Sequence, residues 1–167
     1  MHPSEVIKTH GAEILRLWAA SVDFREDVVI SPDILTRLSE AYRKLRNTFR
    51  YCLGNLYDFD PEKDSVEPAS FEEIDVWALA KTANVMKEVQ FAFERFYFHW
   101  VYRSLYDLAT VDLSAFYFDI IKDRLYTAPA RSERRRAAQT ALYRIADALV
   151  RAVAKSAGIG VFRWAGG

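Results

Sequence analysis

The stretch SPDILTRLSEAYRKLRNTFRYCLGNL, residues 31–56, predicts a long amphipathic helix. Its apolar residues recur every three or four positions from Ile34 to Leu56, so that they form a single stripe along one side. Ser31 and Pro32 supply a start signal, since a serine hydroxyl caps free N–H groups and proline suits a first turn. The stretch therefore predicts a helix with one buried face and one polar face.

Helical spacing extends over most of the remaining sequence. We expect a shorter helix at residues 3–20, a long helix opened by a capping box at Ser70 and Glu73, a third from near His99 to Arg124 with a kink around 110–113, and a last one from Ser132 to Gly158. Residues 21–30 and 57–69 interrupt the spacing and predict an extended linker and a polar loop. The sequence thus predicts an all-α fold, an antiparallel bundle of four to five helices.

Length and composition favour one folded domain. Of the 167 residues 51% are apolar, and Lys+Arg equal Asp+Glu at 23 each. That balance argues against nucleic-acid binding through bulk charge, but not through a local basic face. The one cysteine, Cys52, lies on the apolar stripe and is expected to be an inert core thiol. We expect a cytoplasmic protein, because there is neither a signal-peptide layout nor an apolar run long enough for a transmembrane helix.

The sequence offers little catalytic or metal-binding chemistry. It holds neither the nucleophile motif G-x-S-x-G nor the phosphate loop G-x-x-x-x-G-K-[ST], and its three histidines show no zinc spacing. Asp119 and Asp123 lie four residues apart on one helix face, but the Glu-x-x-His motifs of di-metal bundles are absent. We therefore interpret this pair as part of a solvated, salt-bridged face.

Basic side chains gather in three places. A cationic strip opposite the apolar stripe is formed at helical spacing by Arg43, Arg46, Asn47 and Arg50. The start of the last helix, where cations oppose the helix dipole, is crowded by Arg131, Arg134, Arg135 and Arg136. The third group is Lys122, Arg124 and Tyr126. Guanidinium binds phosphate and planar side chains stack on bases, so these groups suit RNA; solvated charges with local acidic partners are the alternative for each.

Residues 116–127, FYFDIIKDRLYT, combine aromatic and charged positions in one helix. The inward face is expected to hold Phe116 and Ile120, with Ile121 and Leu125 beside them. The outward face is expected to hold Asp119, Lys122, Asp123, Arg124 and Tyr126. By the same spacing, Trp77 is expected to turn inward from the helix that follows Ser70.

Four segments carry a family resemblance: GAEILRLWAAS (11–21), ISPDILTRLSEAYRKLRNTFRYCLGNL (30–56), VDLSAFYFDIIKDRLYT (111–127) and AAQTALYRIADALVRAVA (137–154). In order and spacing they resemble the helical anticodon-binding domain of bacterial isoleucyl-tRNA synthetase, a class I aminoacyl-tRNA synthetase. The resemblance implies a role in holding the anticodon stem-loop of the tRNA for isoleucine, in the service of isoleucyl-tRNA aminoacylation and protein biosynthesis.

The resemblance also selects candidate contact residues. Polar residues that belong to these motifs and are expected to face outward are candidates for tRNA binding: Arg43, Arg46, Asn47, Arg50, Lys122, Arg124 and Tyr126. Arg16 and Trp18 lie in the first segment, where the resemblance implies the junction with the catalytic domain or a tRNA contact. For Trp18, interdomain or core packing is the alternative.

In that family, a catalytic domain with HIGH-type and KMSKS-type motifs handles ATP, and a cysteine-rich C-terminal module holds zinc. Neither motif nor module occurs in this sequence, so we expect no cofactor and no catalysis from this chain alone. The expected partners are the tRNA and, in the full-length context, the catalytic domain, with no DNA and no membrane. We expect a junction segment at 1–30, the bundle at 31–157 and a divergent tail at 158–167. The alternative function is a structural or protein-interaction bundle without RNA binding.

Overall fold

The computed structural model describes residues 3–157, which are almost entirely helical. The elements are α1 (Pro3–His10), α2 (Ala12–Ser21), α3 (Pro32–Asn55), the 3-10 turn η1 (Pro68–Ser70), α4 (Glu73–Glu94), α5 (Phe98–Asp107), the π-helical segment η2 (Leu108–Tyr117), α6 (Phe118–Thr127) and α7 (Glu133–Ala157). Residues 3–157 contain no β-strand, so the all-α prediction is confirmed. The predicted helix stop at Gly158 and the tail after it lie outside the described residues.

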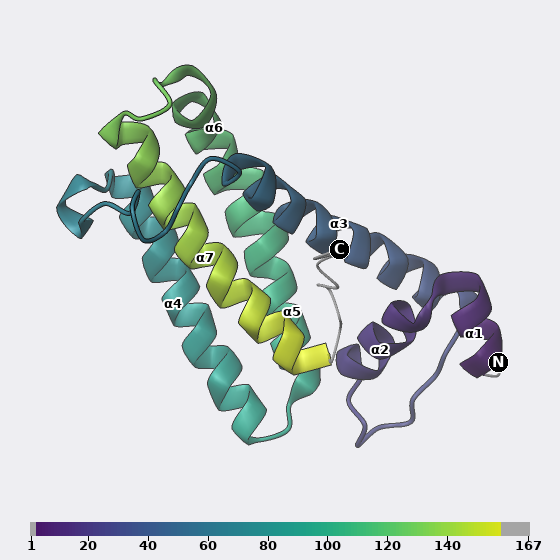
Figure 1. The fold of residues 1–167 in the computed structure, drawn as a ribbon. Coiled ribbons are helices and arrows are strands. Elements are labelled where there is room, and N and C mark those ends of the chain that lie inside the picture. The colour runs from purple at the N-terminus through teal and green to yellow at the C-terminus, as the bar shows by residue number, and fades with distance from the viewer. Residues whose placement is uncertain (1–2, 158–167) are drawn as a thin grey trace.

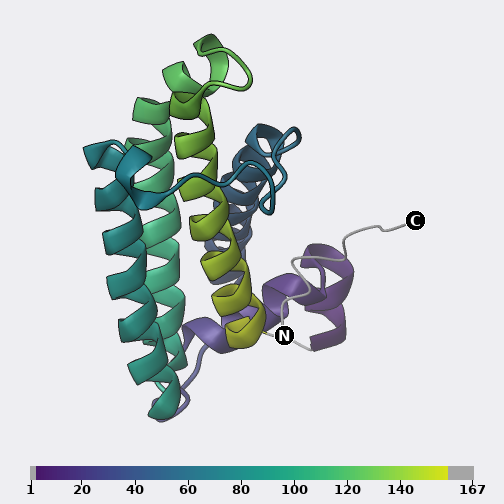
Figure 2. The same ribbon diagram turned by 60° about the vertical axis from the view of Figure 1, so that its left-hand side comes forward.

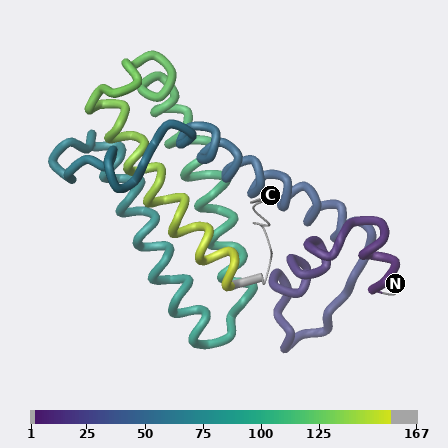
Figure 3. Tube along the Cα trace, viewed as in Figure 1, coloured from purple at the N-terminus to yellow at the C-terminus, as the bar shows by residue number. Residues whose placement is uncertain are grey.

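Three long helical units form an antiparallel bundle. In Figure 1, α4 runs down, α5 returns upward through η2 into α6, and α7 runs down again. Figure 2 shows these units side by side, with α3 against them, and α3 contacts both η2 and α7. Figure 3 shows α5, η2 and α6 as one continuous coil. If α5, η2 and α6 are counted as one helical unit, residues 3–157 form six units rather than the predicted four or five. The additional unit arises because the predicted front helix is divided at Gly11, whose φ is +89°.

The apolar stripe of α3 is buried as its spacing predicts. Ser31 caps the helix, because its hydroxyl accepts a hydrogen bond from the N–H of Ile34 at 3.3 Å. Leu45 and Cys52 are both buried on the opposite side from the polar face. Burial raises the pKa of the Cys52 thiol to about 12, which keeps it protonated and unreactive at neutral pH.

The described residues form two apolar cores. The larger lies between α4, α5, η2, α6 and α7, with the second half of α3 packed on it. The smaller joins the front helices to the first half of α3, and its buried residues are Val6, Ile14, Leu17, Leu35 and Leu38. The front helices therefore pack on the bundle through α2, which contacts α3, α5 and α7.

The predicted start of α4 is wrong by two residues. The capping box is formed by Glu72 and Asp75, with the N–H of Glu72 donating to the Asp75 carboxylate at 3.1 Å. Ser70 belongs to η1 instead, and its hydroxyl donates to the carboxylate of Glu133. Trp77 is also not an inward residue, because its ring lies partly exposed against that of Phe116 with centroids 5.0 Å apart.

The inward face of residues 116–127 is confirmed in part, because Ile121 and Leu125 are buried as predicted but Phe116 and Ile120 are not. Phe116 and Ile120 are 47% and 44% exposed, whereas Tyr117 and Ile121 are fully buried. The reason is η2, since a π-helix takes more residues per turn than an α-helix and so rotates everything that follows it. The kink predicted around 110–113 falls inside this π-helical segment.

Candidate nucleic-acid interface

The cationic strip of α3 is present as the sequence predicts. Arg43, Arg46, Asn47 and Arg50 are all exposed. Among residues 3–157, no carboxylate lies within ion-pair distance of any of these three arginines. Each guanidinium is therefore available to an anion from outside the chain. The strip faces outward because the opposite side of the same helix, including Leu45 and Phe49, is buried.

The structure brings part of the strip together with α6. A hollow of about 330 Å³ separates the two helices and is lined by Asn47, Tyr51, Ser114, Phe118, Asp119, Lys122 and Tyr126. Three residues predicted independently from the sequence, Asn47, Lys122 and Tyr126, thus border one site. We name this site the α3–α6 hollow.

Aromatic stacking and hydrogen bonds hold the two sides of the hollow together. The rings of Tyr51 and Phe118 stack with centroids 4.3 Å apart, and the Tyr51 hydroxyl donates to the Phe118 carbonyl at 3.2 Å. Burial raises the pKa of Tyr51, and a hydrogen bond with Tyr126 adds to this. On α3, the buried Thr48 hydroxyl lies 2.9 Å from the Ser114 hydroxyl of η2. These contacts fix the spacing between α3 and α6.

Arg124 does not belong to this surface, so the prediction that it faces outward is wrong. Its side chain is 3% exposed, and it donates two hydrogen bonds to the Asp75 carboxylate, at 2.6 and 2.8 Å. Burial lowers the pKa of Arg124, but the hydrogen bonds and charge of Asp75 more than offset this, and the net pKa is raised. The guanidinium is committed to an internal ion pair and cannot reach RNA.

Asp75 is a structurally important residue that was not among those predicted from the sequence. It is fully buried, caps α4, holds Arg124 and accepts a hydrogen bond from the Tyr117 hydroxyl at 2.8 Å. Burial, followed by the charge of Asp75, raises the pKa of Tyr117 and keeps its hydroxyl protonated as a donor. The signal in the sequence was an acid three residues after Glu72, the spacing of a capping box.

The arginines at the start of α7 also find partners within the chain. Arg135 forms an ion pair with Asp58 at 2.6 Å, and Arg136 lies 3.6 Å from Asp64. Arg134 pairs with Glu72 at 2.7 Å. The hydrogen bond from Arg135 lowers the pKa of Asp58 to about 2. Three of these four arginines are thus paired with carboxylates of this chain, which come from the loop before α4 and from the N-terminal cap of α4.

The two front candidates lie elsewhere. Arg16 is exposed on α2, and Trp18 packs against the smaller core beside it. Neither lines the α3–α6 hollow. The indole N–H of Trp18 is buried and has no hydrogen-bond partner among residues 3–157. Core packing therefore accounts for the position of Trp18.

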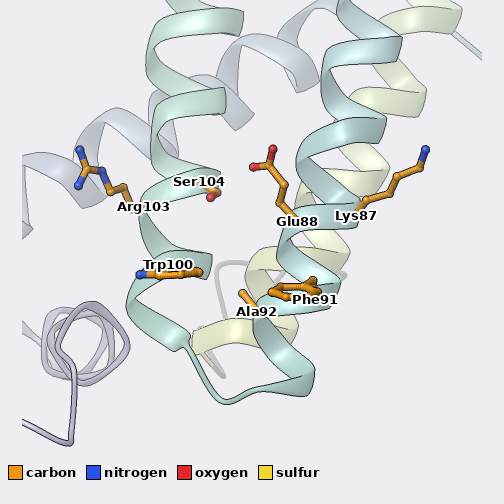
Figure 4. A pocket seen from close by; sticks show the side chains of 7 residues that line it. All are labelled: Lys87, Glu88, Phe91, Ala92, Trp100, Arg103 and Ser104. Carbon is orange, nitrogen blue, oxygen red and sulfur yellow. The ribbon is translucent and has the colours of Figure 1, made fainter.

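A second hollow of about 600 Å³ lies between α4 and α5 (Figure 4). Its lining residues are Lys87, Glu88, Phe91, Ala92, Trp100, Arg103 and Ser104. Phe91 and Trp100 approach it from the two helices, and both rings are about half exposed. Helical spacing in the sequence does not predict this groove, because its two helices lie next to each other only in the folded bundle.

Among residues 3–157, no group of three or more His, Cys, Asp or Glu side chains is arranged to hold a metal ion. Asp119 accepts a hydrogen bond from Lys122 at 2.6 Å, as expected of a salt-bridged face. None of the helices in the described part of the chain combines the length and the apolar character needed to cross a membrane.

Comparison with known proteins shows similarity to tRNA ligases. Residues 75–154 match the family described as the anticodon-binding domain of tRNA ligase. The chain is 54% identical over 151 residues to an isoleucine–tRNA ligase of Desulforudis audaxviator, and 52% identical over 149 residues to that of Symbiobacterium thermophilum. A third relative, the isoleucine–tRNA ligase of Syntrophotalea carbinolica, is 51% identical over 152 residues.

These matches cover most of this chain but only a small part of each ligase. They take in 89–91% of this chain but only 16% of each ligase, so the chain spans about one sixth of the length of these relatives. The resemblance inferred from the four sequence segments is confirmed. Residues 75–154 match the anticodon-binding domain family of tRNA ligases, and about 90% of the chain is similar to one section of bacterial isoleucine–tRNA ligases.

Proposed function

We propose that this chain binds the anticodon stem-loop of the tRNA for isoleucine through the α3 strip and the α3–α6 hollow. In this role it serves isoleucyl-tRNA aminoacylation, with ATP and amino-acid chemistry carried out by a catalytic domain on the same full-length ligase. We expect neither ATP nor zinc to bind residues 1–167, and we expect the protein to act in the cytoplasm. In the full-length context, residues 1–30 join the bundle to that catalytic domain.

One observation carries the proposal. Arg43, Arg46 and Arg50 are exposed, point away from the core of α3 and have no carboxylate partner within the described chain, whereas three of the four arginines at the start of α7 are paired. Unpaired guanidinium groups at helical spacing suit the phosphates of an RNA backbone, which they bind bidentately. Tyr126 and Asn47 at the adjoining hollow add the planar and amide groups that contact unpaired bases.

The test is salt-dependent binding of transcribed tRNA for isoleucine, measured against a random RNA of equal length. We expect the logarithm of the association constant to fall linearly with the logarithm of salt concentration, by about 0.7–0.9 for each phosphate contacted. Replacing all three strip arginines by alanine is expected to reduce that slope by about 2–3 and to weaken binding at low salt.

A matched control removes the same total charge elsewhere. The control variant replaces three exposed arginines that lie outside the strip, namely Arg103, Arg144 and Arg151. We expect it to retain most of the slope, because general charge loss alone does not remove the contacts. If the parent chain binds the isoleucine tRNA no tighter than random RNA, the specific version of the proposal is wrong.

A second candidate function is protein contact through the groove between α4 and α5. The observation in its favour is the pair of half-exposed rings, Phe91 and Trp100, facing one another across that groove. It predicts self-association or partner capture that Trp100→Ala abolishes. A clean monomer in sedimentation at micromolar concentration, with no binding of an exposed-hydrophobe dye, would argue against it.

A further inference from the structure

The α3–α6 hollow has the size and lining of a site for one planar group. Its volume of about 330 Å³ lies at the small end of the roughly 300–1,000 Å³ typical of ligand pockets. The Tyr126 side chain is 66% exposed, and no ring among the described residues stacks on it. An exposed aromatic ring beside a hollow offers a stacking surface, which every nucleobase can use.

The polar groups of the hollow are partly unused. The Asn47 side chain is exposed and makes no hydrogen bond with residues 3–157, so its amide offers both a donor and an acceptor. One Asp119 oxygen accepts from Lys122 at 2.6 Å, while its other oxygen has no hydrogen-bond donor within the described chain. The Ser114 hydroxyl, by contrast, is already engaged by Thr48. Two acceptors and one donor are thus free to meet a ligand.

This set of groups favours some bases over others. A carboxylate oxygen and an amide oxygen are acceptors, and they match the exocyclic amino group of adenine, cytosine or guanine. Uracil carries carbonyl oxygens at its edges and has no amino group to donate. Its single ring N3–H can donate to only one of the two acceptors, so the other faces a carbonyl oxygen and stays unpaired, and this costs binding free energy.

We propose that the α3–α6 hollow receives one unpaired nucleobase bearing an exocyclic amino group, stacked on Tyr126 and contacted at its edge by Asn47 and Asp119. This inference rests on the proposed function, since it assigns a base to the surface that the arginine strip binds through phosphates. Lys122, held by Asp119, lies at the same hollow and is placed to meet the phosphate of that nucleotide. The strip thus supplies salt-dependent affinity and the hollow supplies selectivity.

The experiment uses the 167-residue chain and an RNA hairpin of the isoleucine anticodon stem and loop. Each loop nucleotide is replaced in turn by an abasic one, and affinities are measured by fluorescence anisotropy at constant salt. We expect one abasic position to weaken binding about tenfold, the effect of losing one base–aromatic stack. At that position, adenine, cytosine or guanine should bind at least about fivefold tighter than uracil.

Protein variants connect the effect to the hollow. Tyr126→Ala is expected to weaken binding of the intact hairpin about tenfold. Binding of the abasic hairpin should stay unchanged, because that hairpin already lacks the base that stacks on Tyr126. Asp119→Asn is expected to reduce the preference over uracil at that position. The control is Tyr57→Ala, which removes another exposed tyrosine outside the hollow and should change neither affinity. Thermal unfolding verifies that each variant is folded.

The outcomes separate the two proposals. If the parent binds the hairpin but no abasic position weakens binding by more than twofold, the base site is overturned and phosphate binding by the strip stands. The same holds if Tyr126→Ala weakens intact and abasic hairpins equally, or if uracil binds as tightly as the amino-bearing bases. If the parent binds no RNA even at low salt, the proposed function and the base site are both wrong.

Discussion

Arginines in two regions of this molecule have opposite surroundings. On α3, Arg43, Arg46 and Arg50 project from an exposed face and meet no carboxylate among residues 3–157. Between α6 and α4, Arg124 is buried and donates to both oxygens of Asp75. Both groups occur in motifs of the same family resemblance, and both were predicted to contact tRNA.

The difference shows that motif membership does not distinguish an arginine that binds a ligand from one that stabilises the fold. A buried arginine is retained because its removal leaves a carboxylate uncompensated. An exposed, unpaired arginine contributes little to stability, so its placement is more informative about binding. Substitutions of single charged residues can test this comparison. The more exposed the ion pair, the smaller the expected loss of unfolding free energy.

The largest effect is expected from Arg124→Ala. This variant leaves the fully buried Asp75 carboxylate without its cation, with the Tyr117 hydroxyl as its remaining buried side-chain donor, and should lower the free energy of unfolding by about 3–5 kcal/mol. Urea denaturation monitored by circular dichroism measures it. The control is the triple variant Asp75→Leu, Tyr117→Phe and Arg124→Met, which removes the carboxylate together with both of its buried side-chain donors and should restore part of the loss. A change below about 1 kcal/mol in the single variant would contradict the buried ion pair.

A smaller and pH-dependent effect is expected from Asp58→Asn. The folded pKa of Asp58 is about 2, below its ordinary 3.8, so the folded state binds fewer protons than the unfolded state in this range. The stabilisation is therefore present above about pH 4 and is lost as the pH falls through about 2. After a discount for partial exposure, it amounts to about 1–2 kcal/mol at neutral pH.

The measurement for Asp58→Asn is the free energy of unfolding of variant and parent at several pH values. The difference between them should shrink as the pH falls from neutral toward 2. Asp123→Asn serves as the control, because this carboxylate is exposed on α6 and no ion pair to it was found within the described chain. A difference for Asp58→Asn that stayed constant over the whole pH range would exclude the ion pair with Arg135 as its source.

Arg134→Ala is expected to change stability only slightly. Arg134 pairs with Glu72 at 2.7 Å, but their side chains are 67% and 40% exposed. Exposed pairs contribute about 0–1 kcal/mol, and salt screens them. Chemical denaturation at low and high salt measures the effect, which should diminish as salt is added. A loss of unfolding free energy as large as that of Arg124→Ala would contradict the expectation that exposed ion pairs contribute less than buried ones.

The smallest change in stability is expected from the strip. Replacement of Arg43, Arg46 and Arg50 by alanine should alter the free energy of unfolding by less than about 0.5 kcal/mol per site, because exposed residues without partners contribute little. The same triple variant is expected to lose most of its salt-dependent RNA binding. Thermal unfolding and RNA titration of the same sample compare the two effects. A strongly destabilised triple variant would show that the strip has a structural role.

Local sequence features predicted the helices but not the rotation of every helix. The cap at Ser31 and the stripe through Leu45 and Cys52 were correct, since both depend only on residues within a few turns. Phe116 and Ile120 were placed in the core wrongly, because the π-helical turns of η2 shift the face that follows. A fixed helical period cannot detect such a shift.

At the candidate site, the sequence predicted the α3 strip and two of the α6 residues that line the hollow. Lys122 and Tyr126 were recognised as outward residues, and both line the hollow with Asn47. The roles of Asp119 as a free acceptor and of Tyr51 as a stacked support were not predicted. Both depend on the approach of α6 to α3, which the hydrogen bond between Thr48 and Ser114, 66 residues apart, helps to fix.

The sequence by itself determined the all-α class, the amphipathic faces, the resemblance to isoleucine–tRNA ligases and the row of cations on α3, because each is a local pattern. The tertiary structure decided which cations stay free. Arg124 is paired because Asp75, 49 residues earlier, is folded against it, and Arg135 is paired because Asp58 is brought to the start of α7 across a separation of 77 residues. A charge is neutralised by whatever lies within a few ångströms of it in space, and only the folded chain specifies those neighbours.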